Sequence, residues 1–339
     1  MKFGPVSVDE AIGALAAHSV RTGTMVVRKG TVISENIALQ LKQAGVETII
    51  AARFEPDDIA EDQAALRLAH ALAGDNIVIE APFTGRSNLY AGISGLLLVD
   101  AKAIDGLNAV DEAMTAATLP AYKPVVAGEM VGTVKIIPYA IPELLLRDGI
   151  ARAGEGALRV APYARRSIGV VSTLLPGLKP SVVDKTLAAL SRRLEPAEAR
   201  IVSDRRVRHE AAPLAEELAD QARGDAQLIV VFGASAIADR RDVIPSAIER
   251  AGGRVEHFGM PVDPGNLLLV GSIAGKPVIG APGCARSPKE NGFDWILQRL
   301  LANVPVTRAD IMSLGVGGLL MEIVSRPQPR QGGESEGEE

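Results

Sequence analysis

The chain has a single cysteine, Cys284, among 339 residues, so it contains no intrachain disulfide and no zinc site built from several cysteines. Its four histidines lie far apart in the sequence and show none of the short spacings of metal ligands. No apolar run approaches the roughly 20 residues that a membrane-spanning helix needs, and no signal peptide is recognised at the start. We therefore expect a cytoplasmic protein without a membrane partner.

Aromatic residues are also scarce, at 3% of the chain, so valine, isoleucine, leucine and alanine must fill the core. The hydrophobic fraction of 47% and the mean hydropathy of +0.17 are typical of a globular protein with much buried sheet. The net charge is −5 and charges of both signs are mixed, which argues against a general nucleic-acid-binding surface. The length is sufficient for two or three domains with cores of their own.

Residues 1–75 are predicted to form a small α/β unit. Ser7 and Glu10 have the spacing of a capping box, which predicts that a helix begins at Ser7. Gly45 follows a second amphipathic stretch, as glycine commonly does at the end of a helix. The expected elements are a helix from Ser7 to about residue 16, a strand at 26–27, a helix from Ser34 to Ala44, a strand at 46–51 and a helix from Pro56 to Leu72.

Residues 76–165 are predicted to form a β-rich middle region. Residues 84–90 are interpreted only as a polar, glycine-containing segment, and residues 104–113 show helical spacing. The expected strands are at 77–79 and 96–99, with two more inside 124–137 joined by a glycine-containing turn.

Strands and helices alternate regularly from residue 166 to residue 326. The run Leu228–Phe232 is wholly apolar, as in a strand buried on both faces. This alternation predicts an α/β domain with a doubly wound, mainly parallel sheet, in which ligands bind at the carboxyl ends of the strands. Residues 327–339 are polar and are predicted to be a disordered tail. The expected strands are 167–172, 199–203, 228–232, 254–258, 267–270 and 277–279, and the expected helices are 180–194, 210–222, 245–251 and 288–301.

Four loops that follow these strands contain the candidate site residues. Small residues after Phe232 allow a sharp turn, and the free N–H groups of that turn and of the next helix favour an anion. Asp204 and Asp242, each placed at the end of a strand, are predicted to be catalytic residues and ligands of Mg²⁺. Further residues of these loops are predicted to bind a cofactor that carries an anionic group. They are Ser172, Thr173, Gly233, Ala234, Ser235, Arg241, Pro282, Gly283, Arg286 and Ser287.

Each of these residues also has a structural interpretation. A Ser-Thr pair after a strand is commonly a cap or a turn, and an aspartate beside two arginines is commonly a solvated ion pair. A lone cysteine in a Pro-Gly loop, as at Cys284, is commonly a packing residue. Only the convergence of four loops on one end of a sheet favours a functional site.

Residues 167–303 resemble the molybdopterin-binding domain shared by molybdopterin adenylyltransferases and molybdenum insertases of molybdenum-cofactor biosynthesis. The segment Arg240–Pro245 resembles the R-R-D-V-T-P segment of the adenylyltransferases, and residues 202–204 resemble their strand-end aspartate. The Ser172-Thr173 turn resembles the S-T-G-D-E turn of the insertases, and residues 281–283 resemble their L-P-G-N-P motif.

The chain departs from both families at several positions. Leu174 and Leu175 replace the acidic pair of the insertase turn, and Cys284 replaces the asparagine of the P-G-N-P loop. Phe232 stands where the family has the first of two glycines. Backbone donors and small residues remain, so these changes affect catalysis more than the binding of pterin or phosphate.

The resemblance implies two hypotheses. In the first, the chain is an enzyme that binds molybdopterin, with Mg²⁺ held by Asp204 and Asp242, and that uses ATP to transfer an adenylyl group or inserts molybdate. In the second, it is a non-catalytic carrier that hands molybdopterin or the finished cofactor to other biosynthesis proteins or to molybdoenzymes. The resemblance also implies a homo-oligomer, and Mg²⁺-dependent ATP turnover distinguishes the two hypotheses. A general nucleotide-binding α/β protein is a more distant alternative, because the chain has neither a G-x-G-x-x-G nor a P-loop motif.

Overall fold

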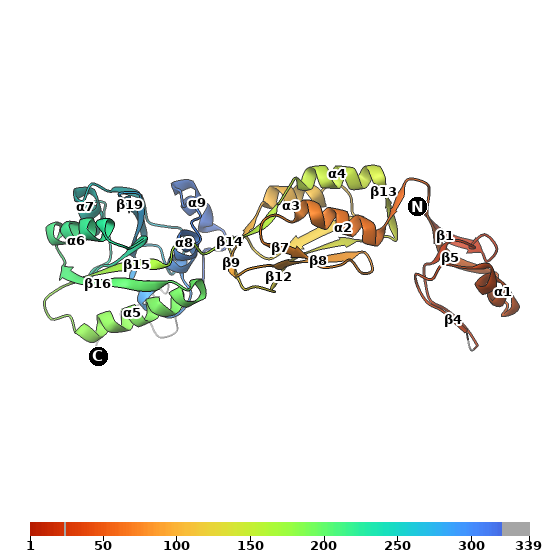
Figure 1. Cartoon of the computed structure of the whole chain (residues 1–339), viewed down its shortest axis with the longest axis horizontal. Helices are drawn as coiled ribbons and strands as arrows, with labels where there is room; N and C mark the ends of the chain where they lie inside the picture. Colours follow the sequence, from red (N-terminus) through yellow and green to blue (C-terminus); the bar gives the residue numbers. More distant parts are fainter. Residues whose placement is uncertain (24, 321–339) are drawn as a thin grey trace, which may run out of the picture. The chain divides into compact units, whose positions relative to one another are not determined.

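The computed structural model describes residues 1–23 and 25–320, which divide into two compact units (Figure 1). The first unit comprises Met1–Ile93 and Leu97–Val160, and the second comprises Ser94–Leu96 and the chain from Ala161 onward. The tail predicted at 327–339 lies outside the described residues, and the predicted boundaries near residues 75, 165 and 326 stay predictions. Within the described residues, every helix is too short or too polar to cross a membrane.

The first unit begins with a small sheet packed against one helix. Strand order is β1-β5-β2, with antiparallel pairing throughout, and Leu41, Ile33 and Val8 are among the buried residues of its core. Ser34 caps the helix by accepting a hydrogen bond from the amide of Ile37, as the sequence predicted. The elements are β1 (Lys2–Ser7), β2 (Leu15–Ala16), β3 (Val20–Thr22), β4 (Met25–Val27), α1 (Glu35–Gln43) and β5 (Thr48–Arg53).

The helix predicted to begin at Ser7 is wrong. The Ser7 hydroxyl does contact the carboxylate of Glu10 at 2.7 Å, and it accepts a bond from the Glu10 amide at 3.3 Å. However, Ser7 is the last residue of β1, paired with Thr48, and the chain after it forms turns that end at Gly13, whose φ is +83°. The capping contacts therefore stabilise a turn, because the glycine and the following strand β2 prevent helix propagation.

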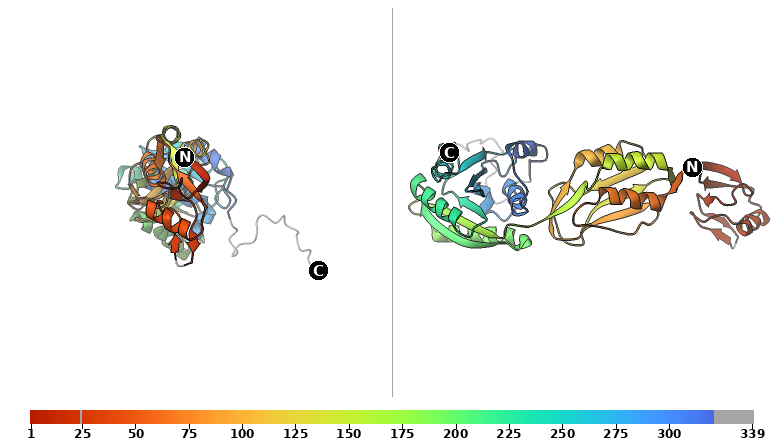
Figure 2. Two further views of the ribbon diagram at one scale, coloured as in Figure 1. Left: turned by 90° about the vertical axis from the view of Figure 1, so that its right-hand side faces the viewer. Right: turned by 45° about the horizontal axis from the view of Figure 1, so that its top comes forward.

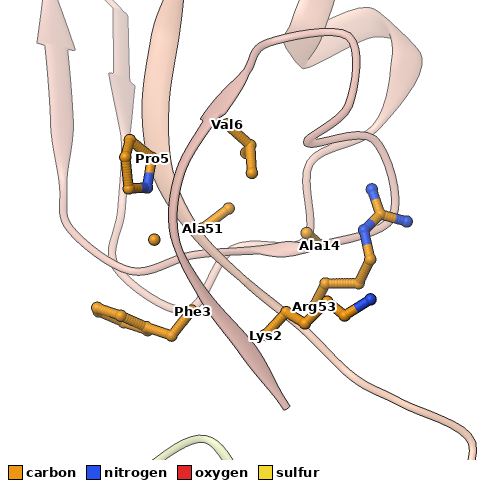
Figure 3. A pocket seen from close by; sticks show the side chains of 8 residues that line it. Lys2, Phe3, Pro5, Val6, Ala14, Ala51 and Arg53 are labelled. Carbon is orange, nitrogen blue, oxygen red and sulfur yellow. The ribbon is translucent and has the colours of Figure 1, made fainter.

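A shallow pocket of about 290 Å³ lies on this sheet beside β1 (Figure 3). Gly4 and Ala51 are paired in register, so the base of the pocket consists of small residues. Lys2 and Arg53 are also paired in register and form its cationic end. Phe3, which is 58% exposed, lies on the side of the pocket away from Arg53.

The rest of the first unit places three helices over an antiparallel sheet of order β10-β12-β8-β7 (Figures 1 and 2). Leu68, Leu89 and Leu146 are fully buried in their common core. Two further small sheets have the orders β11-β9-β14 and β13-β6. The elements are β6 (Asp58–Ala60), α2 (Glu61–Leu72), β7 (Ile77–Ile79), β8 (Arg86–Ala91), β9 (Gly95–Val99), α3 (Ala101–Asn108), β10 (Met114–Thr118), β11 (Pro124–Val125), β12 (Met130–Ile136), β13 (Ala140–Pro142), α4 (Glu143–Ala153) and β14 (Leu158–Pro162).

Three predictions for this region need correction. Helix α2 begins at Glu61 and not at Pro56, because residues 58–60 pair with β13 as strand β6. The segment 84–90 is mostly strand β8, whose polar residues occupy one face of a sheet. Helix α4 was not predicted.

The second unit contains a six-stranded sheet of order β16-β15-β17-β20-β19-β18. The first four strands in this order run parallel, and β19 and β18 are antiparallel to their neighbours. The elements are β15 (Ser167–Leu174), α5 (Pro180–Leu194), η1 (Glu195–Ala197), β16 (Arg200–Arg208), α6 (Ala211–Arg223), β17 (Leu228–Phe232), α7 (Val243–Arg250), β18 (Arg254–Phe258), β19 (Leu269–Ile273), β20 (Lys276–Ala281), η2 (Gly283–Arg286), α8 (Gly292–Leu301), α9 (Arg308–Met312) and η3 (Ser313–Gly315).

Both faces of this sheet are covered by helices. Val171 and Val231 pack in one buried cluster with Leu214 of α6 and with residues of α7. On the opposite face, the ring of Phe232 lies 6.4 Å from the ring of Phe293 in α8. The mixed α/β fold with a mainly parallel sheet is therefore confirmed, and the full doubly wound arrangement stays a prediction. The carboxyl ends of β15, β17 and β20 meet at one edge, where the candidate loops begin.

Candidate functional site

Thr173, at the end of β15, joins two other strand ends at this edge. Its Oγ1 accepts a hydrogen bond of 2.8 Å from the amide of Ala234, which follows β17. The same oxygen lies 2.8 Å from Nδ1 of His209, which follows β16. Thr173 is 1% exposed, so these contacts fix the hydroxyl in the interior. His209 was missed by the sequence analysis, because nothing in its local sequence marks it as a neighbour of β15.

Arg286 is the cation of the site. It donates 2.7 Å to the carbonyl oxygen of Gly233 and 3.1 Å to the hydroxyl of Thr186 in α5, and its guanidinium carbon lies 5.8 Å from the ring centre of Phe232. Burial lowers the pKa of this guanidinium. Within the described residues no carboxylate lies within ion-pair distance of it. A half-buried cation without a counterion attracts an anion, as the sequence predicted for Arg286.

Ser172 places a free hydroxyl on the same face of the sheet as Phe232. The two residues are paired in register between the parallel strands β15 and β17, so their side chains point to the same side. Ser172 is 2% exposed, and its Oγ has no hydrogen-bond partner in the described part of the chain. Burial of an unsatisfied hydroxyl is unfavourable, so a polar group that approached this oxygen would be bound favourably.

The turn after β17 depends on glycine at position 233. A Cβ atom built on Gly233 would lie 2.6 Å from the carbonyl oxygen of Ser235, which no side chain tolerates. The tight turn exposes Ser235 and Ala236, whose amides donate to no group among the residues that the structure describes. These amides supply the backbone donors that the sequence predicted for an anion.

Asp242 is the N-cap of α7. Its Oδ1 accepts from the amide of Val243 at 2.7 Å, and its Oδ2 accepts from the amide of Ala238 at 3.0 Å. Arg241 instead pairs with Asp239 at 2.7 Å, and its side chain is 92% exposed. The hydrogen bond from Arg241 lowers the pKa of Asp239. Both oxygens of Asp242 therefore stabilise the local main chain. The side chain of Arg241 faces solvent.

The predicted position of Asp204 at a strand end is wrong. Strand β16 continues to Arg208, four residues beyond Asp204, or about 13 Å at the usual rise per residue. The strand continues because its main chain pairs with β15 up to Leu174, whatever the polarity of its side chains. The Asp204 carboxylate lies 3.1 Å from Arg206, which also contacts Asp184 of α5. Asp204 therefore lies inside strand β16, and not in the loops at the carboxyl ends of the strands.

The loop after β20 is held by buried polar residues that the sequence analysis missed. Pro282 caps the short helix η2, which contains Gly283 and Arg286, and the Ser287 hydroxyl accepts from the amide of Lys289 at 3.3 Å. Arg193 of α5, 9% exposed, donates to the carbonyl oxygens of Ala285, Ser287 and Lys289. The last large helix begins at Gly292, not at Pro288 as predicted, since Asn291 and Asp294 form its capping box. An asparagine with an acidic residue three positions later was the signal available in the sequence.

The described residues contain no group of three or more histidine, cysteine, aspartate or glutamate side chains that could hold a metal ion. The site at the carboxyl edge is instead a set of hydroxyls, backbone amides and one arginine. Such donors select a ligand with an anionic group.

Comparison with known proteins gives a family match for part of the chain. Residues 168–303 match a family model described as "Probable molybdopterin binding domain", and residues 5–53 match the model of a domain of unknown function. A search of the curated proteins returned no match.

Among solved structures, the chain is similar to a molybdopterin biosynthesis MoeA protein from Pyrococcus horikoshii, at 15% identity and a TM-score of 0.33, over 89% of this chain and 75% of that one. A second MoeA structure from that organism has 9% identity and a TM-score of 0.28, over 92% and 75% of the two chains. A molybdenum cofactor biosynthesis protein from Pyrococcus furiosus has 10% identity and a TM-score of 0.26, over 92% and 65%. The identification depends on the family model alone: residues 168–303 are similar to the molybdopterin-binding domain family of molybdenum-cofactor biosynthesis.

Proposed function

We propose that the second unit binds molybdopterin, or a related intermediate, in molybdenum-cofactor biosynthesis, with the phosphate of the ligand at the carboxyl ends of β15, β17 and β20. The observation that carries the proposal is Arg286, a half-buried guanidinium that has no carboxylate partner among residues 1–23 and 25–320 and that lies inside the domain matched by the family model. The amides of the exposed residues Ser235 and Ala236 supply further donors.

The chemistry of these groups fits a phosphate ester. A planar guanidinium and several N–H and O–H donors satisfy the oxygens of a phosphate, and the ring of Phe232 keeps water from one side of Arg286. The Thr173–His209 contact holds the third strand end in place, so the donors are positioned before a ligand arrives.

The proposed function has two forms, an enzyme and a carrier. In the first, bound Mg²⁺ and ATP support adenylyl transfer or molybdate insertion. In the second, the domain carries the pterin without reacting with it. The partners of Asp204 and Asp242 favour the carrier, because both Asp242 oxygens already accept backbone amides and Asp204 is paired with Arg206 inside a strand. These two carboxylates are therefore not arranged to share a metal ion, and the proposed binding of the pterin does not require a metal ion.

The test is calorimetric titration of the full chain with molybdopterin, with and without Mg²⁺ and ATP. We expect binding by the parent protein and at least about tenfold weaker binding by Arg286→Gln, since a hydrogen bond to a charged group contributes about 1.5–3 kcal/mol. Arg192→Gln is the matched control, because Arg192 is an exposed arginine of α5 with the same change in charge. Pyrophosphate release that requires Mg²⁺ would establish the enzyme, and binding indifferent to both additions would establish the carrier. Absence of binding by the parent would refute the proposal.

A further inference from the structure

A separate cavity of about 280 Å³ lies in the second unit, at the opposite end of the sheet. It is bounded by β18, β19 and β20 and by the segment that joins α8 to α9. Pro277, at its floor, is the second residue of β20, whereas the proposed phosphate site follows the last residue of that strand. The lining residues on which the argument depends are Arg165, Arg254, Glu256, Val270, Ser272 and Leu300.

Arg165 contributes a guanidinium to the lining of this cavity. One of its terminal nitrogens donates 2.5 Å to the carbonyl oxygen of Leu300, and its own amide donates 2.9 Å to Leu301, so Arg165 holds the end of α8. Within the part of the chain that the structure describes, no carboxylate lies within ion-pair distance of this guanidinium. Burial lowers its pKa. A guanidinium remains charged at neutral pH, so an anion in the cavity would offset its lost hydration.

Two other polar side chains line the same cavity. The hydroxyl of Ser272 in β19 has no hydrogen-bond partner among the described residues and is therefore available to a ligand. Arg254 is already neutralised by Glu256, whose carboxylate lies 2.7 Å away. The two arginines and one glutamate leave the lining with one excess positive charge, which belongs to Arg165.

The size and the walls of the cavity indicate more than an inorganic ion. Its volume of about 280 Å³ is well above the roughly 30 Å³ that one water molecule occupies in the liquid. Val270, Pro277, Leu300 and Val306 provide apolar surface beside the cation. We propose that this cavity binds a small organic anion, whose carboxylate or phosphate contacts Arg165 and Ser272 and whose apolar part packs against Val270 and Leu300. The proposal does not depend on the function assigned to the carboxyl edge.

The first experiment is a titration of the full chain, labelled with nitrogen-15 in arginine, in which the Nε–Hε signals are followed by NMR. Phenyl phosphate, benzoate and inorganic phosphate are the probes, and Arg165→Lys assigns the signal of Arg165. We expect the Arg165 signal to shift to saturation, and to do so at lower concentrations of the two organic anions than of inorganic phosphate. If only the Arg286 signal shifts, the probe binds at the other edge and the proposal is wrong. Equal affinity for the three probes would overturn the apolar part of the proposal.

Variants then test the contacts by calorimetry with phenyl phosphate. Arg165→Gln is expected to weaken binding by about tenfold or more, from the loss of a charged hydrogen bond. Arg166→Gln is the control, because the neighbouring Arg166 pairs with exposed Glu198 and does not line the cavity. Ser272→Ala keeps the contact between Arg165 and Leu300, so the fold is retained, and it should weaken binding several-fold. Unchanged affinity in both Arg165→Gln and Ser272→Ala would overturn the proposal.

Discussion

The Nε atom of Arg193 lies 2.5 Å from Oδ1 of Asp294, although the two residues are 101 positions apart in the chain. Their side chains are only 7% and 17% exposed, so the ion pair joins α5 to α8 in the interior of the second unit. The same guanidinium holds three carbonyl oxygens of the loop that positions Arg286. The candidate site therefore depends on a residue that would not contact its ligand.

We expect Arg193→Ala to lower the free energy of unfolding by about 3–5 kcal/mol, because it leaves a largely buried carboxylate without its partner. Urea unfolding followed by circular dichroism measures the change. Arg192→Ala, which removes the exposed neighbouring arginine, should stay within about 0.5 kcal/mol of the parent. A similar small effect for both variants would show that the interior pair is not important for stability.

The glycine of the turn after β17 gives a second prediction. Gly233→Ala should weaken ligand binding and lower the stability by about 1–3 kcal/mol, because the new Cβ would lie 2.6 Å from the carbonyl oxygen of Ser235. Gly283→Ala is the matched control in the facing loop, since a Cβ there has no atom within 4 Å. Thermal unfolding of both variants checks the difference in stability, and molybdopterin titration of Gly233→Ala checks the effect on binding. Equal behaviour of the two alanine variants would contradict the proposed tight turn.

The two roles open to Asp242 can be separated by substitution. As an N-cap, Asp242→Ala should cost about 0.5–2 kcal/mol, whereas Asp242→Asn should cost less, because asparagine keeps one accepting oxygen and loses only one of the two bonds from backbone amides. Any dependence of ligand binding on Mg²⁺ is then measured in Asp242→Asn and in the double variant with Asp204→Asn. Loss of Mg²⁺ dependence in a variant with parent-like stability would support the metal role and count against the carrier.

Stability at acid pH gives a prediction for the first unit. Hydrogen bonds from Arg67 and then Arg147 lower the pKa of Glu143 from 4.5 to about 2. A carboxyl whose pKa is lower in the folded state stabilises the fold above the unfolded pKa, and that contribution is lost as the pH falls through the folded pKa. The difference in unfolding free energy between the parent and Glu143→Gln should therefore be full above pH 4.5 and shrink toward pH 2. Chemical denaturation at several pH values measures it, and a difference that does not change with pH would contradict the assignment.

The elements that the sequence predicted best are those decided by local pattern. Helix α5 begins at Pro180 and ends at Leu194, as expected, and β17 coincides with its continuous apolar run. Local pattern failed where long-range pairing decides the structure. The polar strand β16 extends well past Ser203 because β15 offers it a full set of main-chain partners.

The same distinction explains the candidate site. Thr173 lies near the end of a strand, and Gly233 and Arg286 follow strands, so their meeting at the carboxyl ends of the strands follows from the parallel sheet that the sequence predicted. Thr186 lies in the middle of α5 and Arg193 in its last turn, and only the packing of that helix on the sheet places them beside the loops. The roles of such residues cannot be read from their neighbours in the sequence.

Strand β16 has one further consequence. It forms one edge of the six-stranded sheet, and its outer side has no neighbouring strand in that sheet. Such an edge can recruit a strand from another molecule and start aggregation. Five of its nine residues are charged, namely Arg200, Asp204, Arg205, Arg206 and Arg208. Charged side chains on an edge strand disfavour pairing with a strand of another molecule, so we expect this composition to oppose self-association through β16.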